Sequence, residues 1–574
     1  MDSSDETYDF VVVGSGGGSM CAALYMKSIG KEPIVLEKTD LIGGSSAMSG
    51  GVLWIPNNPL NREAGIQDSD EKSLQYLDTL TVTPDPGRGG TPARRKAFVE
   101  NGSKMIDFLR REGIELIRAR GYSDYYDDSP GGMAEGRAIV AKIFDVNRLG
   151  PEWSRKLRLT GIRLPLTITE VAKIGLVKKT WEGRVTAFKF ALRMMRNRLL
   201  GTDLVGTGAA LQGRMLEKSL KEGVEVRVNS PVSELIVENG RVTGVIVRKD
   251  GIEKRINARL GVLINAGGFS RNAEMRAKYQ PDVTTEWTNA NPGDTGEMIE
   301  EVLRIGGSVD AMDAAWWIST SLPPELYAQG RGQLKPMHIQ EIAKPHAIMV
   351  DSSAQRYCNE AASYMEVGQK QIARHRSGVN AIPSWMILDS QHRANYMLAK
   401  AMPGAKLSPE WIEQGYVKVG ETIADLARAC ELDPAVLEAT VDRFNGFART
   451  GVDEDFHRGR RKYDSWFGDP TNKPSATLGA IEKGPFYAIR IYPGDVGTAG
   501  GIVADEFARA LTPDGKVIPG LYATGNSSAP VTGHYYVGPG TSIGASFTFG
   551  YIAARHAAAS SNSGAVEMAG RAGA

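Results

Sequence analysis

The N-terminal end of the chain contains the pattern that most restricts its fold. Residues 8–13 are a short run of aromatic and β-branched side chains, which is typical of a buried parallel strand. The run leads into a glycine-rich turn at residues 14–19, an alanine-rich stretch that predicts a helix to about Gly30, and a second apolar run that ends at Glu37. Strand, glycine turn, helix, strand and acid follow in the order that a dinucleotide-binding unit requires. The pattern predicts a Rossmann-like α/β domain.

Each part of this unit has an expected role. Gly14 permits the tight turn, and Gly16 lets the backbone approach a pyrophosphate at the N-terminus of the helix. Glu37 can accept hydrogen bonds from ribose hydroxyls. A glycine-rich turn without a ligand is the alternative, and the agreement of the whole unit disfavours it. The predicted cofactor-binding residues here are Gly14, Ser15, Gly16, Gly17, Gly18, Glu37 and Lys38.

A second loop favours FAD over NAD. Small residues and hydroxyls cluster at residues 43–51, where they suit the ribityl chain and ring of a flavin. Strand and turn patterns at residues 226–232, 242–268 and 520–526, with a helix from about residue 542, supply further pieces from both ends of the chain. The other predicted FAD-binding residues are Gly44, Ser45, Ser46, Ser49, Gly50, Gly51, Val232, Ala266, Gly267, Gly525, Asn526, Ser542 and Ile543.

The length of 574 residues is too great for a single hydrophobic core. We expect an α/β FAD-binding domain from residue 1 to 286, completed by residues 497–574, with an α+β catalytic domain inserted at residues 287–496. The end of the chain is rich in Ala, Gly and Ser, so we expect flexibility after about residue 560.

Charge and composition exclude several classes of protein. The net charge of +1 disfavours a dedicated nucleic-acid binder. The three cysteines are far apart in the sequence, which predicts neither a disulfide framework nor a metal site and suits a reducing compartment. The acidic N-terminus does not resemble a signal peptide, and no apolar run is long enough to cross a bilayer. A cytoplasmic location is expected.

A loop near the C-terminal end carries candidate chemistry. Residues 533–540 place Tyr536 close to Gly540, with Pro539 between glycines. The hydroxyl of Tyr536 and the N–H of Gly540, aimed at one point, would stabilise a developing oxyanion. A tight turn without a catalytic role is the alternative.

Together these segments resemble the 3-ketosteroid Δ1-dehydrogenases, within the fumarate reductase and succinate dehydrogenase flavoprotein superfamily. The resemblance spans about residues 11–555 and rests on residues 121–126, 356–364, 451–459 and 536–540. Fumarate reductases place a proton-donating arginine in the segment where this chain has Tyr364, and a tyrosine cannot clamp two carboxylates. The family has proline after its last tyrosine, whereas this chain has Val537.

The resemblance implies a mechanism in steroid degradation. Tyr364 would remove a proton from carbon 2 as a phenolate, with Tyr125 helping to lower its pKa. Tyr536 and the Gly540 N–H would hold the 3-keto oxygen, while carbon 1 gives hydride to N5 of FAD. The alternatives are a 3-ketosteroid Δ4-(5α)-dehydrogenase, a fumarate or succinate enzyme, and a flavin-containing binding protein without turnover.

The same comparison bears on the cofactor and the acceptor. All seven histidines lie at or beyond His338, so the flavin loop lacks the histidine that bonds flavin in succinate dehydrogenases, and non-covalent FAD is expected. No second dinucleotide motif occurs, which disfavours NAD as the electron acceptor and leaves a quinone open.

Residues 153–198 form a strongly basic segment. They include twelve basic and two acidic residues, interleaved with large apolar side chains. Such a segment is typical of a helix that binds an anionic membrane surface. The alternative is a solvated basic face whose apolar residues pack on the domain.

Overall fold

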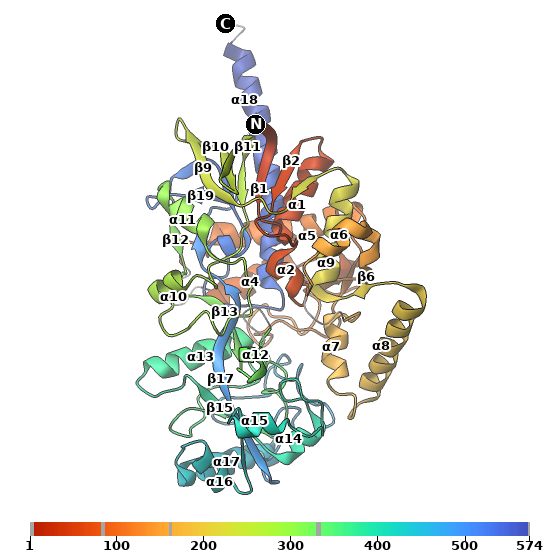
Figure 1. Cartoon of the computed structure of the whole chain (residues 1–574), viewed down its shortest axis with the longest axis vertical. Helices are drawn as coiled ribbons and strands as arrows, with labels where there is room; N and C mark the ends of the chain where they lie inside the picture. The colour runs from red at the N-terminus through yellow and green to blue at the C-terminus, as the bar shows by residue number, and fades with distance from the viewer. Residues whose placement is uncertain (1–4, 82–86, 160–163, 329–333, 572–574) are drawn as a thin grey trace.

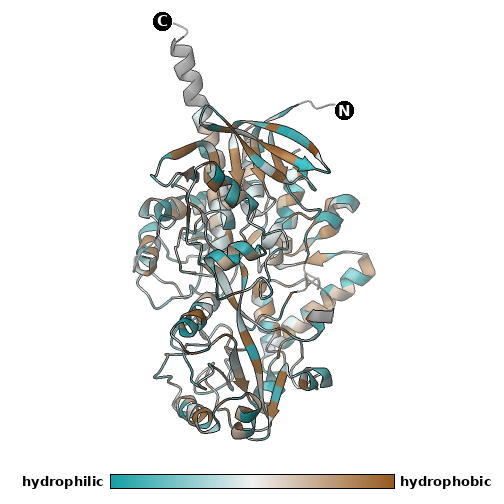
Figure 2. Cartoon of the chain, turned by 60° about the vertical axis from the view of Figure 1, so that its left-hand side comes forward, coloured by the Kyte–Doolittle hydropathy of each residue, from teal (hydrophilic) through white to brown (hydrophobic). Residues whose placement is uncertain are grey.

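The computed structural model describes residues 5–81, 87–159, 164–328 and 334–571. The chain folds into two lobes, with both termini at the end of the molecule formed by the first lobe (Figure 1). Hydrophobic residues occupy much of the strands, whereas the outer helices carry residues of both kinds (Figure 2). Arg163 of the basic segment lies outside the described residues.

The first lobe is built on a mixed sheet whose central strands are parallel. Their order across the sheet is β20-β11-β1-β2-β8. Since β20 comes from the C-terminal end, the sheet joins both ends of the chain, as the sequence predicts. The strands are β1 (Glu6–Val13), β2 (Pro33–Leu36), β8 (Glu225–Arg227), β11 (Ile252–Ile264) and β20 (Val517–Ala523), with β9 (Val232–Glu238), β10 (Arg241–Lys249) and β19 (Arg509–Leu511) added in antiparallel pairs.

Helices cover this sheet and one of them crosses the lobe. α1 (Gly17–Ser28) packs closely against α18 (Thr541–Arg571). A Cβ at Gly17 would lie 2.0 Å from the ring of Phe547, and one at Gly18 would lie 2.3 Å from the Ser546 carbonyl oxygen. The absence of side chains at these two glycines therefore allows α1 and α18 to come into direct contact. α18 remains helical to Arg571, beyond the point where the sequence predicts flexibility. Other helices of the lobe are α2 (Gly44–Met48), α4 (Asp70–Thr81), α5 (Pro92–Arg111), α9 (Thr207–Lys221) and α11 (Glu297–Arg304).

The second lobe has an antiparallel sheet in the order β13-β17-β15-β14, with β16 also paired to β17. Helices follow or flank the strands, consistent with the predicted α+β domain. The strands are β13 (Ala315–Thr320), β14 (Ala347–Val350), β15 (Ser384–Leu388), β16 (Val417–Gly420) and β17 (Phe486–Thr498), and the helices are α13 (Tyr364–Arg376), α14 (Ser390–Asn395), α15 (Pro409–Glu413), α16 (Ile423–Ala429) and α17 (Pro434–Thr450).

The packing differs from the expected domain boundaries. α11 follows residue 287, yet Met298 and Val302 pack in the same hydrophobic cluster as Val11 of β1. The expected boundary at residues 496 and 497 falls inside β17, which pairs with β13 as far as Thr498. The second lobe therefore begins nearer to β13 than the sequence pattern indicates, because the turns before it fold back on the first lobe.

The basic segment forms a helical hairpin at the edge of the molecule. Its helices are α7 (Ile168–Ile174) and α8 (Trp181–Leu200), and α7 lies between α8 and the body of the protein (Figure 1). Only Gly183 and Thr186 of α8 are buried. In the described ranges no helix combines the length and apolar character needed to cross a membrane.

Candidate active site

A cavity of 700 Å³ is lined by residues of both lobes. Its walls include all the predicted FAD-binding residues except Gly17 and Gly18, which face α18 instead. Tyr125, Tyr364, Tyr536 and Gly540 line the same cavity. The structure thus brings together residues from both ends and the middle of the chain.

The first part of the cavity fits a dinucleotide. Gly14 has φ +93°, and a Cβ there would lie 2.3 Å from the Asn265 carbonyl oxygen, so only glycine is tolerated. Gly16 is the N-cap of α1 and lines the cavity, so the positive end of the helix lies at the cavity, while the N–H groups of Gly17 and Gly18 donate to the hydroxyls of Ser46 and Ser546. The Ser15 hydroxyl donates to Glu37 at 2.6 Å and thereby orients that carboxylate. The turn, the helix end and the acid therefore lie on one cavity, which is the arrangement that dinucleotide binding requires.

The loop predicted to hold the flavin contacts an acid, Asp294, that the sequence pattern did not identify as a site residue. The Ser45 hydroxyl donates to Asp294 at 3.2 Å, and Asp294 lines the cavity. Burial raises the pKa of Asp294 to about 7. The sequence at residues 291–296 is compatible with a domain crossover near the flavin or with a plain turn, and it gives Asp294 no role of its own; the fold places this segment against Ser45. Lys38 also lines the cavity and forms an ion pair with Glu297 at 2.9 Å.

Three tyrosines from distant parts of the chain meet at the other part of the cavity. The ring centroids of Tyr125 and Tyr364 are 5.9 Å apart, and the Tyr536 ring lies 5.3 Å from each of them. Tyr364 is the first residue of α13, and Tyr536 belongs to the loop before α18. The three phenols predicted to act together are therefore mutual neighbours.

The two predicted oxyanion donors also meet. The N–H of Gly540 donates to the Tyr536 hydroxyl at 3.3 Å, so both donors reach the same small region. Gly540 has φ +86°, and a Cβ there would lie 2.0 Å from the Val52 carbonyl oxygen. Its own carbonyl accepts from the N–H of Gly544 at the start of α18. The Gly540 amide is thus at the positive end of a long helix, which favours a negative oxygen.

Val537 holds the loop through its backbone where the family has proline. The residue is fully buried, and its carbonyl oxygen accepts from the Tyr76 hydroxyl at 2.6 Å and from the Tyr125 N–H at 3.0 Å. The second bond ties Tyr125 directly to the loop that carries Tyr536. Hydrogen bonds therefore fix the loop without the stiffness of a proline.

The environment of Tyr364 does not lower the pKa of its phenol, although the resemblance leads us to expect this. Burial, followed by the neighbouring Tyr536, raises the pKa of Tyr364 well above its usual value. Tyr125 acts in the lowering direction, as the resemblance implies, but its effect is smaller than that of burial. Tyr364 is consequently a neutral phenol at neutral pH in this environment, and the expected net lowering of its pKa is not found.

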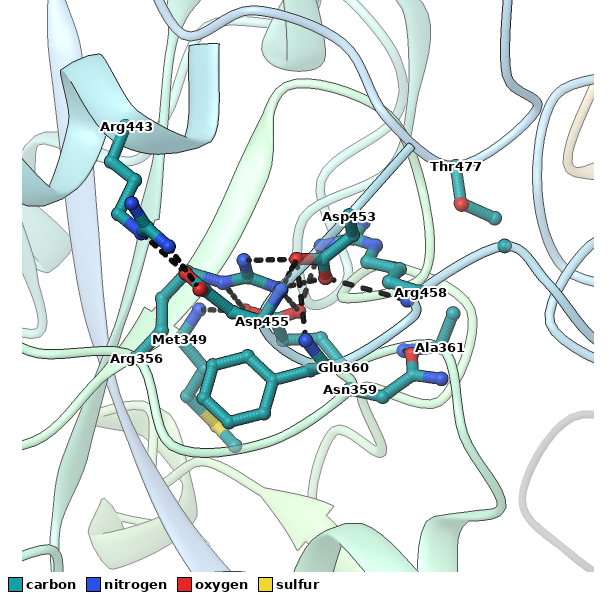
Figure 3. A network of polar contacts seen from close by, with 12 residues as sticks. Met349, Arg356, Asn359, Glu360, Ala361, Arg443, Asp453, Asp455, Arg458 and Thr477 are labelled. Atoms are coloured by element: carbon teal, nitrogen blue, oxygen red, sulfur yellow. Dashed lines mark hydrogen bonds and ion pairs between the residues drawn. The ribbon is translucent and has the colours of Figure 1, made fainter. Parts of the chain in front are cut away.

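A buried ion network anchors the start of α13 (Figure 3). Arg356 pairs with Glu360 and with Asp453 at 2.8 Å each, and Arg458 pairs with Glu360 at 3.2 Å. Burial alone would raise the pKa of Glu360, but Arg356 and Arg458 hold it below its usual value. Since Glu360 lies four residues before Tyr364, the network fixes the turn that delivers this tyrosine to the cavity.

Other aromatic residues complete the wall. The Tyr463 ring lies 4.4 Å from that of Tyr125, a contact that no sequence motif indicated. Of the adjacent tryptophans, Trp316 lies 4.8 Å from Tyr536 and lines the cavity, whereas Trp317 lines a separate cavity of 460 Å³ beside α13. Alternation along β13 explains why only one of them faces the site.

Comparisons with known proteins match nearly the whole chain. A family model described as an FAD binding domain matches residues 9–543. A 3-oxosteroid 1-dehydrogenase of Mycolicibacterium smegmatis is 38% identical over 569 residues, which cover 96% of this chain and 98% of the relative. A 4-oxocyclohex-2-ene-1-carboxylate 5-dehydrogenase of Sinomonas cyclohexanicum is 34% identical and covers 96% of this chain and 93% of the relative.

A solved structure has the same overall fold. The crystal structure of a 3-ketosteroid Δ1-dehydrogenase from Sterolibacterium denitrificans, in complex with 1,4-androstadiene-3,17-dione, superimposes with a TM-score of 0.89. It is 34% identical in sequence, and the match covers 97% of this chain and 100% of that chain. Both lobes are therefore included in the similarity.

Proposed function

The chain belongs to the FAD-binding 3-oxosteroid 1-dehydrogenase family, and from this premise we propose that it introduces a double bond between carbons 1 and 2 of a 3-ketosteroid in steroid degradation. The observation that carries the proposal is the meeting of Tyr125, Tyr364, Tyr536 and the Gly540 N–H on a cavity shared with the FAD-binding residues. FAD, when bound, supplies the acceptor for the hydride that leaves carbon 1.

The first task of the protein is to polarise the ketone. The proton on carbon 2 becomes acidic only when charge can move to the 3-keto oxygen. The Tyr536 hydroxyl and the Gly540 N–H, which lie within 3.3 Å of each other, would both donate to that oxygen. The N-terminus of α18 adds a favourable field at the same point.

The second task is proton removal. Tyr364 would accept the carbon 2 proton at its phenolate oxygen, with Tyr125 beside it to stabilise that charge. Because burial opposes ionisation of Tyr364, the phenolate is a small fraction of the enzyme at neutral pH. The oxyanion donors and the base would then act on adjacent atoms of one ring.

A cyclic ketone with a carboxylate is the second candidate substrate, because one relative is named for such a compound. Within the described ranges, the basic residue lining the cavity is Lys38, which already pairs with Glu297 beside the dinucleotide-binding residues. Among the described residues, a carboxylate held at the tyrosines would have no cation beside it, and an unpaired buried charge is costly. This environment favours an uncharged substrate.

The Tyr-x-Gly-Pro-Gly form of the loop at residues 536–540 disfavours the other steroid enzyme considered, a 3-ketosteroid Δ4-(5α)-dehydrogenase, which acts on carbons 4 and 5.

The test compares turnover of two substrates by the holoenzyme. Androst-4-ene-3,17-dione and 4-oxocyclohexanecarboxylate are each supplied with an artificial electron acceptor, and products are identified by mass spectrometry. We expect a 1,4-diene from the steroid and little turnover of the carboxylate. Turnover of the carboxylate alone would overturn the proposal.

The FAD is proposed to be held non-covalently and to be reoxidised by a quinone. Acid precipitation should release all the flavin into the supernatant, and flavin retained in the pellet would contradict this. The reduced holoenzyme should be reoxidised by a soluble quinone and not by NAD⁺, whose binding would need a second dinucleotide site.

The outer face of α8 supports a membrane-bound location. Trp181, Val185, Phe188, Leu192, Met195 and Leu199 follow at alternating intervals of four and three residues, which places them on one side of the helix. We call this set the apolar stripe. Its ends are strongly exposed, with Trp181 at 76% and Leu199 at 74%. The buried residues Gly183 and Thr186 lie on the opposite side, against α7.

Basic side chains flank the apolar stripe. Arg184, Lys189, Arg196 and Arg198 are exposed on α8. Apolar residues that enter a lipid interface, with basic residues beside them for anionic headgroups, are the features of a helix lying on a membrane. Each basic residue near an anionic surface contributes roughly 1 kcal/mol. We propose that the protein docks peripherally on the cytoplasmic side of the inner membrane, where a sterol-like substrate dissolves.

Flotation with liposomes tests this docking. The holoenzyme should float with anionic vesicles at low salt and stay behind with zwitterionic vesicles. Replacing Trp181 and Phe188 by serine should abolish flotation, whereas Ile252→Ser, at a hydrophobic residue exposed on β11, should not. Retention of the wild type in the soluble fraction with anionic vesicles would refute the proposal.

A further inference from the structure

The described residues that α7 and the segment at residues 334–340 contribute to the cavity wall are mostly apolar. Ile168, Val171, Leu334, Met337 and Ile339 line it together with Gln340. Gln340 is half-buried, and within the described ranges its side-chain amide makes no hydrogen bond. An amide at this position can pair with a polar group of a ligand in the cavity, because it carries both N–H donors and an acceptor oxygen.

The segment that carries Gln340 lies away from the tyrosines along β13. Trp316 contacts Tyr536, Ile318 lines the cavity two residues further on, and Thr320 forms a bridge with Met337. Since a strand rises about 3.3 Å per residue, Thr320 is about 13 Å beyond Trp316. That separation is comparable to the length of a four-ring steroid nucleus. A steroid whose ketone is held at Tyr536 would therefore bring its opposite end to residues 337–340.

Met337 lies where the wall of the cavity reaches the surface of the protein. Its side chain is 42% exposed although it lines the cavity. Gln340 is less exposed than Met337, and its Oε1 lies 3.1 Å from the position of a Cβ at Gly175, the C-cap residue of α7. The amide is thus between the hairpin and the second lobe, where it can reach the distal end of a ligand.

We propose that Gln340 recognises an oxygen substituent on carbon 17 of the steroid. This inference rests on the proposed function above, because only a steroid held by its 3-ketone would present carbon 17 to this wall. The amide N–H would donate to a 17-ketone, and the amide oxygen would accept from a 17-hydroxyl. Substrates with an oxygen at carbon 17 would then be favoured over those with only apolar substituents there.

The test compares two substrates that differ only at carbon 17. Specificity constants, kcat/KM, are measured for androst-4-ene-3,17-dione and for androst-4-en-3-one with wild type and Gln340→Leu. Loss of one neutral hydrogen bond should lower kcat/KM for the dione by about two- to tenfold. The value for the substrate without the oxygen should stay the same or rise. The ratio of the two constants is the readout.

Matched variants separate recognition from packing. Gln340→Met keeps the length of the side chain without its polar atoms and should reproduce the shift in the ratio. Met337→Leu changes the same segment but leaves the amide, and should not shift the ratio. An equal loss for both substrates, or no change for either, would overturn the role of Gln340. Failure of the wild type to dehydrogenate either steroid would instead refute the proposed function itself.

Discussion

Replacing Tyr536 by phenylalanine removes one oxyanion donor with little change in shape. The ring would keep its contacts with Trp316 at 4.8 Å and with Tyr125 and Tyr364 at 5.3 Å. The Gly540 N–H would remain as the other donor. The lost atom is therefore the hydroxyl alone, and bound FAD per chain should equal that of the wild type.

The size of the effect distinguishes two roles for this hydroxyl. A donor that acts on the developing oxyanion is worth on the order of 100- to 1,000-fold in rate, or about 2.7–4 kcal/mol. A hydrogen bond made equally to the bound substrate is worth only about 0.5–1.5 kcal/mol, about tenfold at most. The Gly540 amide at the N-terminal end of α18 stays in place, so only one of the two donors is lost. We therefore expect the rate of Tyr536→Phe to fall by about 100- to 1,000-fold.

Anaerobic stopped-flow measurement of flavin reduction by androst-4-ene-3,17-dione gives the rate directly. Tyr535→Phe is the matched control, because Tyr535 directly precedes Tyr536 in the chain and packs against Tyr126. The control should reduce its flavin at the wild-type rate. A Tyr536→Phe rate within threefold of the wild type would refute the oxyanion role, and loss of FAD would show that the hydroxyl acts in cofactor binding.

Three further results are expected. Because burial raises the pKa of Tyr364, the rate of flavin reduction should rise about tenfold per pH unit from neutral to mildly alkaline pH, and Tyr364→Phe should abolish it; a plateau below pH 8 would contradict this. Glu360→Gln removes the buried carboxylate charge that Arg356 and Arg458 share, leaving Asp453 as the remaining acid of the network, and should cost about 3–5 kcal/mol in denaturant unfolding. Asp455→Asn, in a more exposed pair with Arg443, should cost about 0–1 kcal/mol, and equal effects of the two variants would contradict this ranking. Burial raises the pKa of Asp294 to about 7, above the value of about 4 in an unfolded chain, so the unfolded state loses this proton first as the pH rises. The flavin-free protein should therefore lose stability between about pH 4 and pH 7. Asp294→Asn should lack this pH-dependent loss, and identical pH profiles of Tm for the two proteins would refute the assignment.

Local sequence patterns were sufficient to predict the strand, turn, helix and acid of the dinucleotide unit, because these parts are consecutive in the sequence. The family resemblance nominated Tyr125, Tyr364 and Tyr536, and the fold makes them neighbours. Gly17 and Gly18 show that a local sequence pattern does not predict every contact of its residues. Their spacing predicts a cofactor turn, whereas their contacts are with α18, which lies more than 500 residues away in the sequence.

Other features depend on tertiary packing and could not be read from the chain. The amphipathic character of α8 is visible in the sequence, but which side faces solvent depends on its packing against α7. The sequence around Asp294 fits either a crossover near the flavin or a plain turn, and only the fold shows that the carboxyl group meets Ser45. Gln340 becomes a candidate for ligand recognition only because the fold places its amide on the wall of the cavity.

The central claim is that this chain takes hydrogen from carbons 1 and 2 of a 3-ketosteroid onto its FAD. Anaerobic titration of the oxidised holoenzyme with androst-4-ene-3,17-dione tests it most directly. We predict that the flavin bleaches with one equivalent of steroid, and that the product is androsta-1,4-diene-3,17-dione. A flavin that bleaches with succinate or with 4-oxocyclohexanecarboxylate but stays oxidised with the steroid would contradict the account.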